Sequence, residues 1–384
     1  MPDTRHRRLA LSRRRLLASA LAAMAVTGVT ASMAAASTQG PAPDVHRHLV
    51  TCAEGIRIPV ALAPGQPRDN TISGELCSTP AERRPGSMVQ LLVPGASYTL
   101  DYWDFGTVTG IRYSYARDVA VRGIATFAID PLGSGDSSHP ASSQITAQAD
   151  SYVDHQVVQA LRHGWAAGAR FGQVITVGHS LNSLVVWDEA IAYHDVDGVI
   201  VTGVAHSLAA AFASSGGFHP AITDPRFASS GLDSGYLTTV PGTRGTLFYH
   251  LPDADPAVTA LDEARKDVFS GTELTTALPV VSGTATRAID VPVLDILGSN
   301  DFTTCGLSTA GHVFNCSSGP AVVAQETSFY SPRAQLHACV IPGSGHDVSL
   351  ALNHALQVAD SVAWSGSFVG HDRPGGRGLP GNCG

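Results

Sequence analysis

The sequence has few lysines, no basic cluster beyond its N-terminus and no visible repeat of solenoid length. Lys266 is the only lysine among 384 residues, and 15% of the residues are charged. After residue 36, 18 basic and 31 acidic side chains leave a net charge of −13. Such an acidic chain fits neither nucleic acid nor an anionic membrane as a partner. A hydrophobic fraction of 44% is enough to bury one large core or two smaller ones.

Strongly apolar spans are also missing. Residues 1–36 place Arg13, Arg14 and Arg15 before an Ala-rich run that ends in small residues, which is typical of a secretory signal of the twin-arginine type. A transmembrane anchor is the alternative, but Ala, Thr, Ser and Gly insert poorly into a bilayer. No cysteine follows directly, so a lipoprotein is not expected. We therefore expect a cleaved signal peptide over 1–36, a linker over 37–48, extracellular export and no stable membrane anchor.

The chain has no Cys-x-x-Cys motif, and this absence argues against zinc binding or thiol redox chemistry. An even set of six cysteines in an exported chain instead favours disulfides. Six cysteines allow 15 pairings. Proximity in the sequence favours Cys52–Cys77 and Cys305–Cys316, and Cys339–Cys383 would then fix the C-terminal tail.

What is present is an alternation of apolar strands and helix-like segments. Buried strands of parallel sheets form continuous apolar runs, as several of these segments do. The expected strands are 49–62, 71–77, 88–93, 123–130, 174–177, 199–204, 291–297 and 335–341, and the expected helices are 101–117, 145–167, 253–269, 348–364 and the segment after residue 180. This order predicts an α/β fold with a doubly wound, mostly parallel sheet, in which ligands bind beyond the carboxyl ends of the strands.

One stretch places a serine at such a strand end. In residues 178–182, Gly-His-Ser-Leu-Asn, a β-branched strand meets an apolar segment that can form a helix. This is the layout of a nucleophile elbow, which exposes the Ser180 hydroxyl and places the Leu181 N–H at a helix N-terminus, where it can bind an oxyanion. The alternative interpretation is an ordinary strand–turn–helix with an exposed serine.

Two later strand ends supply an acid and an imidazole. Asp301 follows the strand at 291–297, and His346 follows the strand at 335–341 in a glycine-rich loop. Either residue alone is explained as a turn cap or a loop histidine. Together with Ser180 they appear in the order nucleophile, acid, histidine. His346 would accept the serine proton and Asp301 would orient the imidazole. The competing acid, Asp295, lies within the strand.

At these residues the sequence resembles the α/β-hydrolase superfamily, in its secreted serine esterase and lipase-like branch. The resemblance covers about residues 88–369 and rests on four motifs, at 130–137, 178–182, 298–301 and 343–346. It implies a hydrolase core over 49–205 and 289–370, a tail over 371–384, and a largely helical cap over 206–288, inserted before the strand that leads to Asp301.

The resemblance also implies further site residues. By position, the backbone N–H groups of Ala96 and Leu181 form the oxyanion hole, with Ser97 or Tyr98 as alternatives to Ala96. The family usually has glycine at position 182 and His-Gly at 94–95, whereas this chain has Asn182 and Pro94-Gly95. Aromatic and imidazole side chains beside these motifs are candidates for the substrate pocket, although a role in the core is as good an explanation: Tyr98, Tyr102, Trp103 and His179.

These features predict a secreted serine hydrolase that cleaves an uncharged small-molecule or lipid carboxylic ester through an acyl-enzyme, without cofactor or metal. Acyl transfer, thioester or lactone cleavage and perhydrolysis use the same three residues and stay open. A dehalogenase or epoxide hydrolase is disfavoured because it needs aspartate at position 180. The alternative from another class is a binding protein that has kept the fold without the catalysis.

Overall fold

The computed structural model describes residues 49–166, 168–369 and 379–384. The expected signal peptide and linker (1–48) and much of the expected tail lie outside the described residues. Among the residues described, no helix combines the length and the hydrophobicity needed to cross a membrane.

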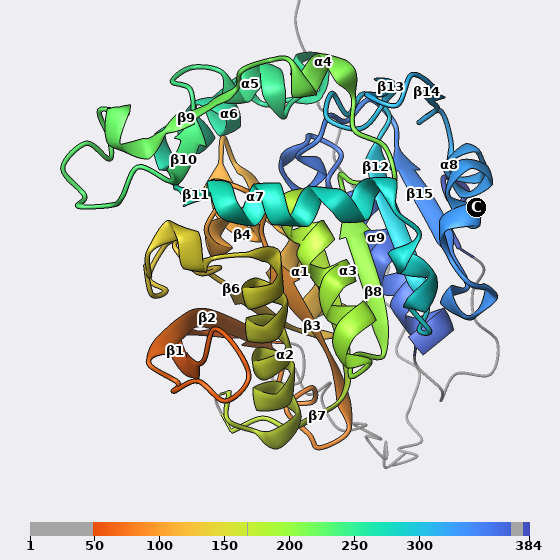
Figure 1. The fold of residues 1–384 in the computed structure, drawn as a ribbon. Helices are drawn as coiled ribbons and strands as arrows, with labels where there is room; N and C mark the ends of the chain where they lie inside the picture. Colours follow the sequence, from red (N-terminus) through yellow and green to blue (C-terminus); the bar gives the residue numbers. More distant parts are fainter. Residues whose placement is uncertain (1–48, 167, 370–378) are drawn as a thin grey trace, which may run out of the picture. The chain divides into compact units, whose positions relative to one another are not determined.

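An eight-stranded sheet forms the centre of the structure (Figure 1), with the strand order β1-β2-β6-β3-β7-β8-β12-β15. The first two strands run antiparallel to their neighbours, and all other pairs are parallel. The sheet is therefore mostly parallel, as the alternating pattern predicts. Its strands are β1 (Thr51–Val60), β2 (Asn70–Ser78), β3 (Ser87–Val93), β6 (Ala125–Ile129), β7 (Phe171–His179), β8 (Gly198–Thr202), β12 (Val293–Gly298) and β15 (His337–Ile341).

Helices cover both faces of this sheet (Figure 1), which is why β6 and β8 are buried along their whole length. On one face α2 (Ala147–His163) and α3 (Leu181–Tyr193) form one hydrophobic cluster with alternate strand residues. On the other face α1 (Tyr115–Val121) and α9 (Ala355–Trp364) form a second cluster. The sheet is thus doubly wound.

The expectation of a helix over 101–117 is wrong for most of that segment. Strands β4 (Asp104–Val108) and β5 (Ile111–Ser114) form a hairpin there, and helix α1 begins only at Tyr115. The turn residues Thr109 and Gly110 both have positive φ angles, 51° and 87°. A two-residue turn of this kind matches the twist of a hairpin, and glycine adopts it without steric cost.

Between β8 and β12 the chain leaves the sheet. We call residues 206–288 the inserted segment. It contains a small antiparallel sheet, β11-β10-β9, beside several short helices. These elements are α4 (Ala210–Ala213), β9 (Phe218–Pro220), β10 (Tyr236–Thr239), α5 (Arg244–Leu247), α6 (Pro256–Arg265), β11 (Phe269–Ser270) and α7 (Gly271–Ala277). In α6, Asp255 caps the N-terminus and Val258 is buried against the core.

Three disulfides join the six cysteines: the two pairs that sequence proximity favours, and the third pair that then remains. Cys52–Cys77 links β1 to β2, Cys305–Cys316 closes a loop after β12, and Cys339–Cys383 fixes the end of the chain to β15. The second of these closes the loop that begins just after Asp301.

Candidate active site

Ser180 occupies a strained turn between β7, which ends at His179, and α3, which begins at Leu181. Its φ and ψ angles are 53° and −124°, a combination that non-glycine residues rarely adopt. The turn brings α3 close to its strand, since a Cβ atom on Gly178 would lie 2.5 Å from the Asn182 carbonyl oxygen. Glycine at position 178 is therefore required for the sharp turn, and the turn presents Ser180 at the carboxyl end of the sheet.

Asp301 and His346 are hydrogen-bonded to each other at the same end of the sheet. The imidazole Nδ1 lies 2.9 Å from Asp301 Oδ2. The other carboxylate oxygen accepts hydrogen bonds from the backbone N–H of Thr303 at 2.8 Å and from its hydroxyl at 2.7 Å. Both side chains are almost completely buried. These bonds fix the carboxylate, and the carboxylate in turn fixes the ring.

The surroundings of His346 favour its use as a base. Burial lowers the pKa of the imidazole, but the charge and hydrogen bond of Asp301, together with the nearby Asp347, raise it above its ordinary value. The opposite ring nitrogen, Nε2, is buried and has no hydrogen-bond partner among the described residues. Gly203 lies against this ring, because a Cβ atom there would be 2.6 Å from Cε1.

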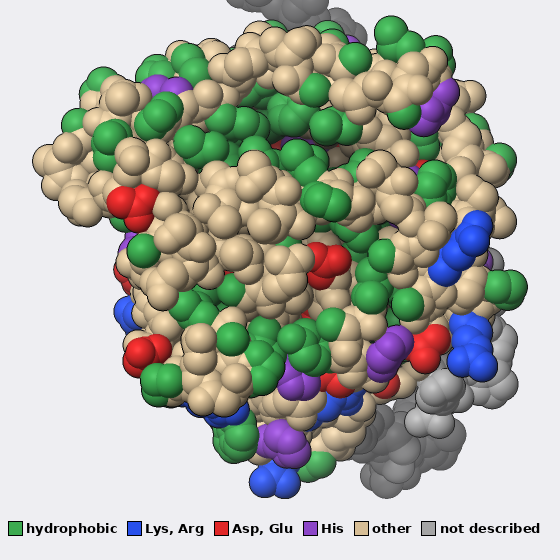
Figure 2. Space-filling model, in the orientation of Figure 1, with side chains coloured by type: hydrophobic (Ala, Val, Ile, Leu, Met, Phe, Trp, Pro, Cys, Tyr) green, Lys and Arg blue, Asp and Glu red, His purple; other side chains and the backbone are tan. Residues whose placement is uncertain are grey.

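A small cavity of about 70 Å³ adjoins Ser180. Ala96, Leu181, Gly203 and Thr303 line it beside the serine, so it reaches the surroundings of the histidine. Its other walls are mainly apolar and come from α3, from the inserted segment and from the turns around them: Leu184, Leu208, Phe212, Phe218, Leu274, Leu278 and Val281. Hydrophobic side chains gather in the hollow between α4 and α7 (Figure 2). The cavity therefore suits an apolar group.

The two expected oxyanion donors, Ala96 and Leu181, both line this cavity. Leu181 is the first residue of α3, and its N–H is one of those that a helix leaves without an internal partner. Asn182 points aside from the helix–strand contact and donates a hydrogen bond to the Pro94 carbonyl oxygen at 2.6 Å. The unusual Asn182 thus ties the elbow to the loop that carries Ala96.

The four expected pocket residues lie elsewhere. Tyr98, Tyr102, Trp103 and His179 are buried and do not line the cavity at Ser180. The ring of His179 stacks on Tyr102 at 4.3 Å and lies 4.7 Å from the ring of His346. Burial, and then the proximity of His346, hold the pKa of His179 well below its ordinary value. Tyr98, Tyr102 and Trp103, which follow β3, and His179, the last residue of β7, thus belong to the core behind His346.

Sequence reasoning missed Thr303, whose hydroxyl lies 2.7 Å from Asp301 Oδ1 and 2.9 Å from His346 Nδ1. Its position two residues after the acid was the only available signal. It also missed the apolar wall of the cavity, because Phe212, Phe218 and Leu274 become neighbours only when the inserted segment folds over α3.

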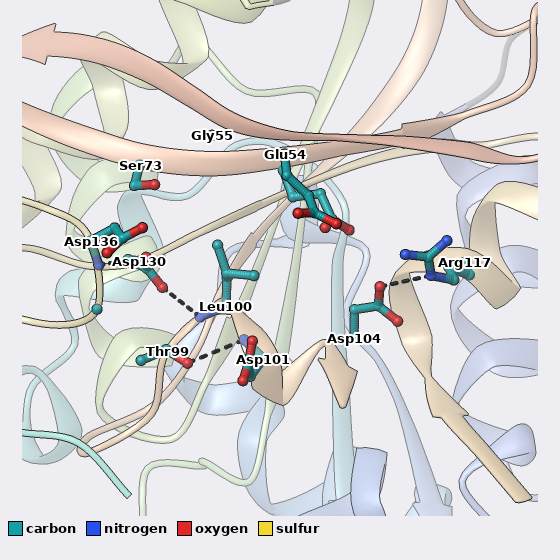
Figure 3. A pocket seen from close by; sticks show the side chains of 12 residues that line it. Glu54, Gly55, Ser73, Thr99, Leu100, Asp101, Asp104, Arg117, Asp130 and Asp136 are labelled. Carbon is teal, nitrogen blue, oxygen red and sulfur yellow. Dashed lines mark hydrogen bonds and ion pairs between the residues drawn. The ribbon is translucent and has the colours of Figure 1, made fainter. Parts of the chain in front are cut away.

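A larger cavity of about 610 Å³ lies between β1, β2 and the segment around Leu100 (Figure 3). Carboxylates dominate its lining: Glu54, Glu75, Asp101, Asp104, Asp130 and Asp136. Burial raises the pKa of Glu75 to about 7. Asp130, from the predicted motif at 130–137, accepts a hydrogen bond from the Leu100 N–H at 2.8 Å. None of the described residues that line this cavity is a histidine, and Ser180, Asp301 and His346 are not among them.

The residues that offer metal ligands have other partners. His206 pairs with Glu326 at 2.6 Å, His219 contacts Asp224, and the ring of His250 bonds the Gly343 carbonyl oxygen. Among the described residues, two of the three clusters with ligand-like spacing contain disulfide cysteines, which have no thiolate to offer. The third, His155 with Glu189 and Asp195, is held by a hydrogen bond between His155 and Asp195. None of these clusters includes Ser180, Asp301 or His346.

The sequence profile of the alpha/beta hydrolase family matches residues 90–361, which is more than half of the chain. This chain belongs to the alpha/beta hydrolase family. The matched region includes Ser180, Asp301 and His346, the elbow of this hydrolase and the strands β6, β7, β8, β12 and β15. A search of curated protein sequences found no match.

Solved structures support the same fold at low sequence identity. The chain is similar to a soluble variant of monoglyceride lipase from Saccharomyces cerevisiae, with a TM-score of 0.55, 15% identity, and coverage of 84% of this chain and 98% of that one. It is also similar to a thermophilic esterase from Thermogutta terrifontis, with a TM-score of 0.51, 16% identity and coverage of 79% and 95%. For an esterase from Exiguobacterium antarcticum the corresponding values are 0.52, 12%, 78% and 96%.

Proposed function

We propose that this hydrolase is a serine carboxylic ester hydrolase in which Ser180, His346 and Asp301 form the catalytic triad. The observation that carries the proposal is the buried Asp301–His346 hydrogen bond of 2.9 Å, which leaves Nε2 without a partner among the described residues while the strained Ser180 lines the adjoining cavity. A base, its orienting acid and an exposed hydroxyl together are what nucleophilic attack on a carbonyl needs.

In this mechanism the Ser180 oxygen attacks the ester carbonyl while His346 Nε2 accepts its proton. The N–H groups of Ala96 and Leu181 stabilise the oxyanion of the tetrahedral intermediate. The imidazolium then donates the proton to the departing alcohol and leaves an acyl group on the serine. Water enters next, His346 takes its proton, and attack on the acyl carbon releases the acid and restores the Ser180 hydroxyl. Asp301 keeps the Nδ1–H directed toward itself throughout.

The apolar cavity beside Ser180 would hold the acyl group. Its volume of about 70 Å³ favours a short, uncharged acyl chain, because the lining side chains offer little to solvate a charge. We propose that the inserted segment acts as a cap over this cavity, since Phe212, Phe218 and Leu274 all come from it. The enzyme would be exported by the twin-arginine route after cleavage of residues 1–36, which agrees with its three disulfides.

A p-nitrophenyl ester series from acetate to palmitate tests this function. We expect the mature chain to hydrolyse the short esters fastest, and Ser180→Ala to lose at least about 10⁴-fold in kcat. A fluorophosphonate probe should label the wild type and spare Ser180→Ala. If the folded wild type neither hydrolyses any ester nor reacts with the probe, the enzyme hypothesis fails and a binding protein is the better explanation.

The same experiment separates the other reactions of the triad. Labelling of Ser180 without hydrolysis of any p-nitrophenyl ester would indicate a thioester or lactone substrate, or an acyl acceptor other than water. Product analysis with added alcohols or peroxide then distinguishes acyl transfer and perhydrolysis from hydrolysis.

A further inference from the structure

A buried ion pair of the inserted segment lies directly behind the candidate active site. Arg244 in α5 and Asp262 in α6 are joined by two parallel hydrogen bonds of 2.9 Å, from Nε and from Nη2. Both side chains are almost fully shielded from solvent. The guanidinium also lies over the ring of Tyr98, 4.1 Å from its centroid. Two buried charges stabilise a fold only when their geometry is good and their remaining hydrogen-bonding groups have partners. The third guanidinium nitrogen of Arg244, Nη1, therefore needs a partner as well.

The partner of Nη1 lies in residues 94–98, which we call the oxyanion loop. Arg244 Nη1 donates a hydrogen bond to the Ser97 hydroxyl oxygen at 2.7 Å. Ser97 has a φ angle of 64°, in the left-handed region that is unfavourable for a residue with a side chain. Its carbonyl oxygen accepts a second bond from the same segment, the N–H of Asp267 at 2.9 Å. Such strain persists where surrounding contacts determine the conformation. Here those contacts hold the residue that follows Ala96.

The same ion pair reaches the histidine loop, residues 343–348. The Tyr98 hydroxyl lies between two carboxylates, 3.1 Å from Asp262 and 2.5 Å from Asp347, the neighbour of His346. The backbone N–H of Asp347 donates to the Phe248 carbonyl oxygen at 3.0 Å. The inserted segment therefore contacts both loops that any acyl-transfer chemistry at Ser180 would use.

We propose that Arg244 is a positioning residue, which holds Ala96 in the oxyanion hole through Ser97 and the loop of His346 through Asp262 and Tyr98. Its catalytic consequence rests on the function proposed above, whereas its effect on the two loops does not. One part of the inserted segment, around Arg244 and Asp262, would then be a fixed component of the active site. The walls formed by Phe212, Phe218 and Leu274 would be the part that adapts to substrate.

The test compares Arg244→Met with a matched control, Lys266→Met. Lys266 is also buried in the inserted segment, and its ammonium group contacts Asp224 at 2.7 Å, Glu263 at 3.5 Å and the Thr239 carbonyl oxygen at 2.8 Å, all outside residues 94–98 and 343–348. Hydrogen–deuterium exchange followed by mass spectrometry reports on the loops without any assumption about activity. We expect Arg244→Met, but not Lys266→Met, to increase amide exchange in peptides covering 94–98 and 343–348.

Steady-state kinetics on the preferred p-nitrophenyl ester measure the consequence. We expect kcat of Arg244→Met to fall about 10- to 100-fold with KM changed less than about threefold, because the loss concerns the transition state. Arg244→Lys keeps the charge but not the bidentate geometry, and should recover part of the loss. Lys266→Met should keep kcat within about twofold of the wild type.

The outcomes separate the two proposals. If amide exchange increases in Arg244→Met but not in Lys266→Met, and the wild type hydrolyses no ester, the positioning role is supported and the proposed function is contradicted. Equal exchange and equal kcat in Arg244→Met and Lys266→Met overturn the positioning role. If Arg244→Met does not fold, Ser97→Ala replaces it, because it removes a single hydrogen bond. Faster exchange at 94–98 with about 10-fold lower kcat then supports the role, and wild-type behaviour overturns it.

Discussion

A Cβ atom on Gly95 would lie only 2.8 Å from the Cβ of Ser180. The oxyanion loop therefore packs against Ser180 through the one residue of the loop that has no side chain, and the separation between Ala96 and Ser180 depends on it. Positions 94–95 depart from the common His-Gly pair of the family only at the proline, so the glycine that makes this contact is kept.

Gly95→Ala should displace the oxyanion loop and lower kcat by about 100-fold, the scale of losing one oxyanion donor. Gly366→Ala is the control, because a Cβ there would meet nothing within 4 Å. Kinetics on the preferred ester and thermal melting of both variants provide the measurement. Wild-type kcat in a folded Gly95→Ala protein would contradict the close packing.

Asn182→Ala removes the hydrogen bond to the Pro94 carbonyl oxygen, which joins the elbow to the oxyanion loop. Because this bond is buried, its loss should lower the free energy of unfolding by about 1–2 kcal/mol. We expect kcat to fall about 10-fold as Ala96 loses its fixed position. Asn70→Ala, which removes only an exposed bond to Asp69, serves as the control. Denaturant unfolding and kinetics that do not distinguish the two variants would disprove the link.

The pH dependence of hydrolysis should follow His346. Burial opposes protonation of the ring, but Asp301 and Asp347 raise its pKa above the ordinary value of 6.5. A general base must be neutral, so kcat/KM should fall as the pH drops below a midpoint higher than 6.5. Asp301→Asn removes the principal charge that raises the pKa, and should shift the midpoint downward with a loss of about 10⁴-fold in kcat. A wild-type midpoint at or below the ordinary value is incompatible with the buried pair.

Stability should fall as the pH rises from about 4 to about 8 because of carboxyl groups buried between α2 and α7. Burial raises the pKa of Asp154 to about 8, and burial together with Asp154 raises that of Glu273 to about 8. In the unfolded chain both lose their protons near their ordinary pKa values of 3.8 and 4.5. Between those values and about 8 the folded state binds more protons, so the free energy of unfolding decreases as pH rises through this window.

Asp154→Asn removes one of these groups. Its melting temperature should therefore decline less than that of the wild type between about pH 5 and pH 9, by a few degrees. Asp136 is an exposed carboxylate, and Asp136→Asn serves as the control. It should leave the change of melting temperature with pH as in the wild type. If the melting temperature of Asp154→Asn declines with pH as steeply as that of the wild type, Asp154 is not protonated in the folded state.

The sheet was predictable because a strand buried on both faces must be apolar along its length, and this signal is local. Strands β3, β6, β7, β8, β12 and β15 all appear within the expected segments or extend them by a few residues. The segment 101–117 was misjudged because its aromatic residues fit a helix as well as a hairpin, and only the turn at Thr109 and Gly110 decides between them. Hairpin pairing is settled by contacts between strands, which propensity does not contain.

Ser180, Asp301 and His346 were identifiable because each follows a strand, and parallel strands end at one edge of a sheet. Thr303 was within reach of the same argument, yet nothing in a single sequence distinguishes a threonine that bonds the acid from one that only terminates a strand. The pocket assignment of Tyr98, Tyr102 and Trp103 relied on their place in the chain, and the side chains turn into the core instead.

The sequence by itself determined the fold family, the order of the three candidate catalytic residues and the favoured cysteine pairs, because these depend on local patterns and on short separations along the chain. Only the tertiary structure decided what surrounds them. Arg244 meets Ser97 from a position 147 residues away, and Tyr98 meets Asp347 from 249 residues away. Contacts over such separations form when the inserted segment packs onto the sheet, and side-chain packing, unlike strand periodicity, leaves no repeating signal in the sequence.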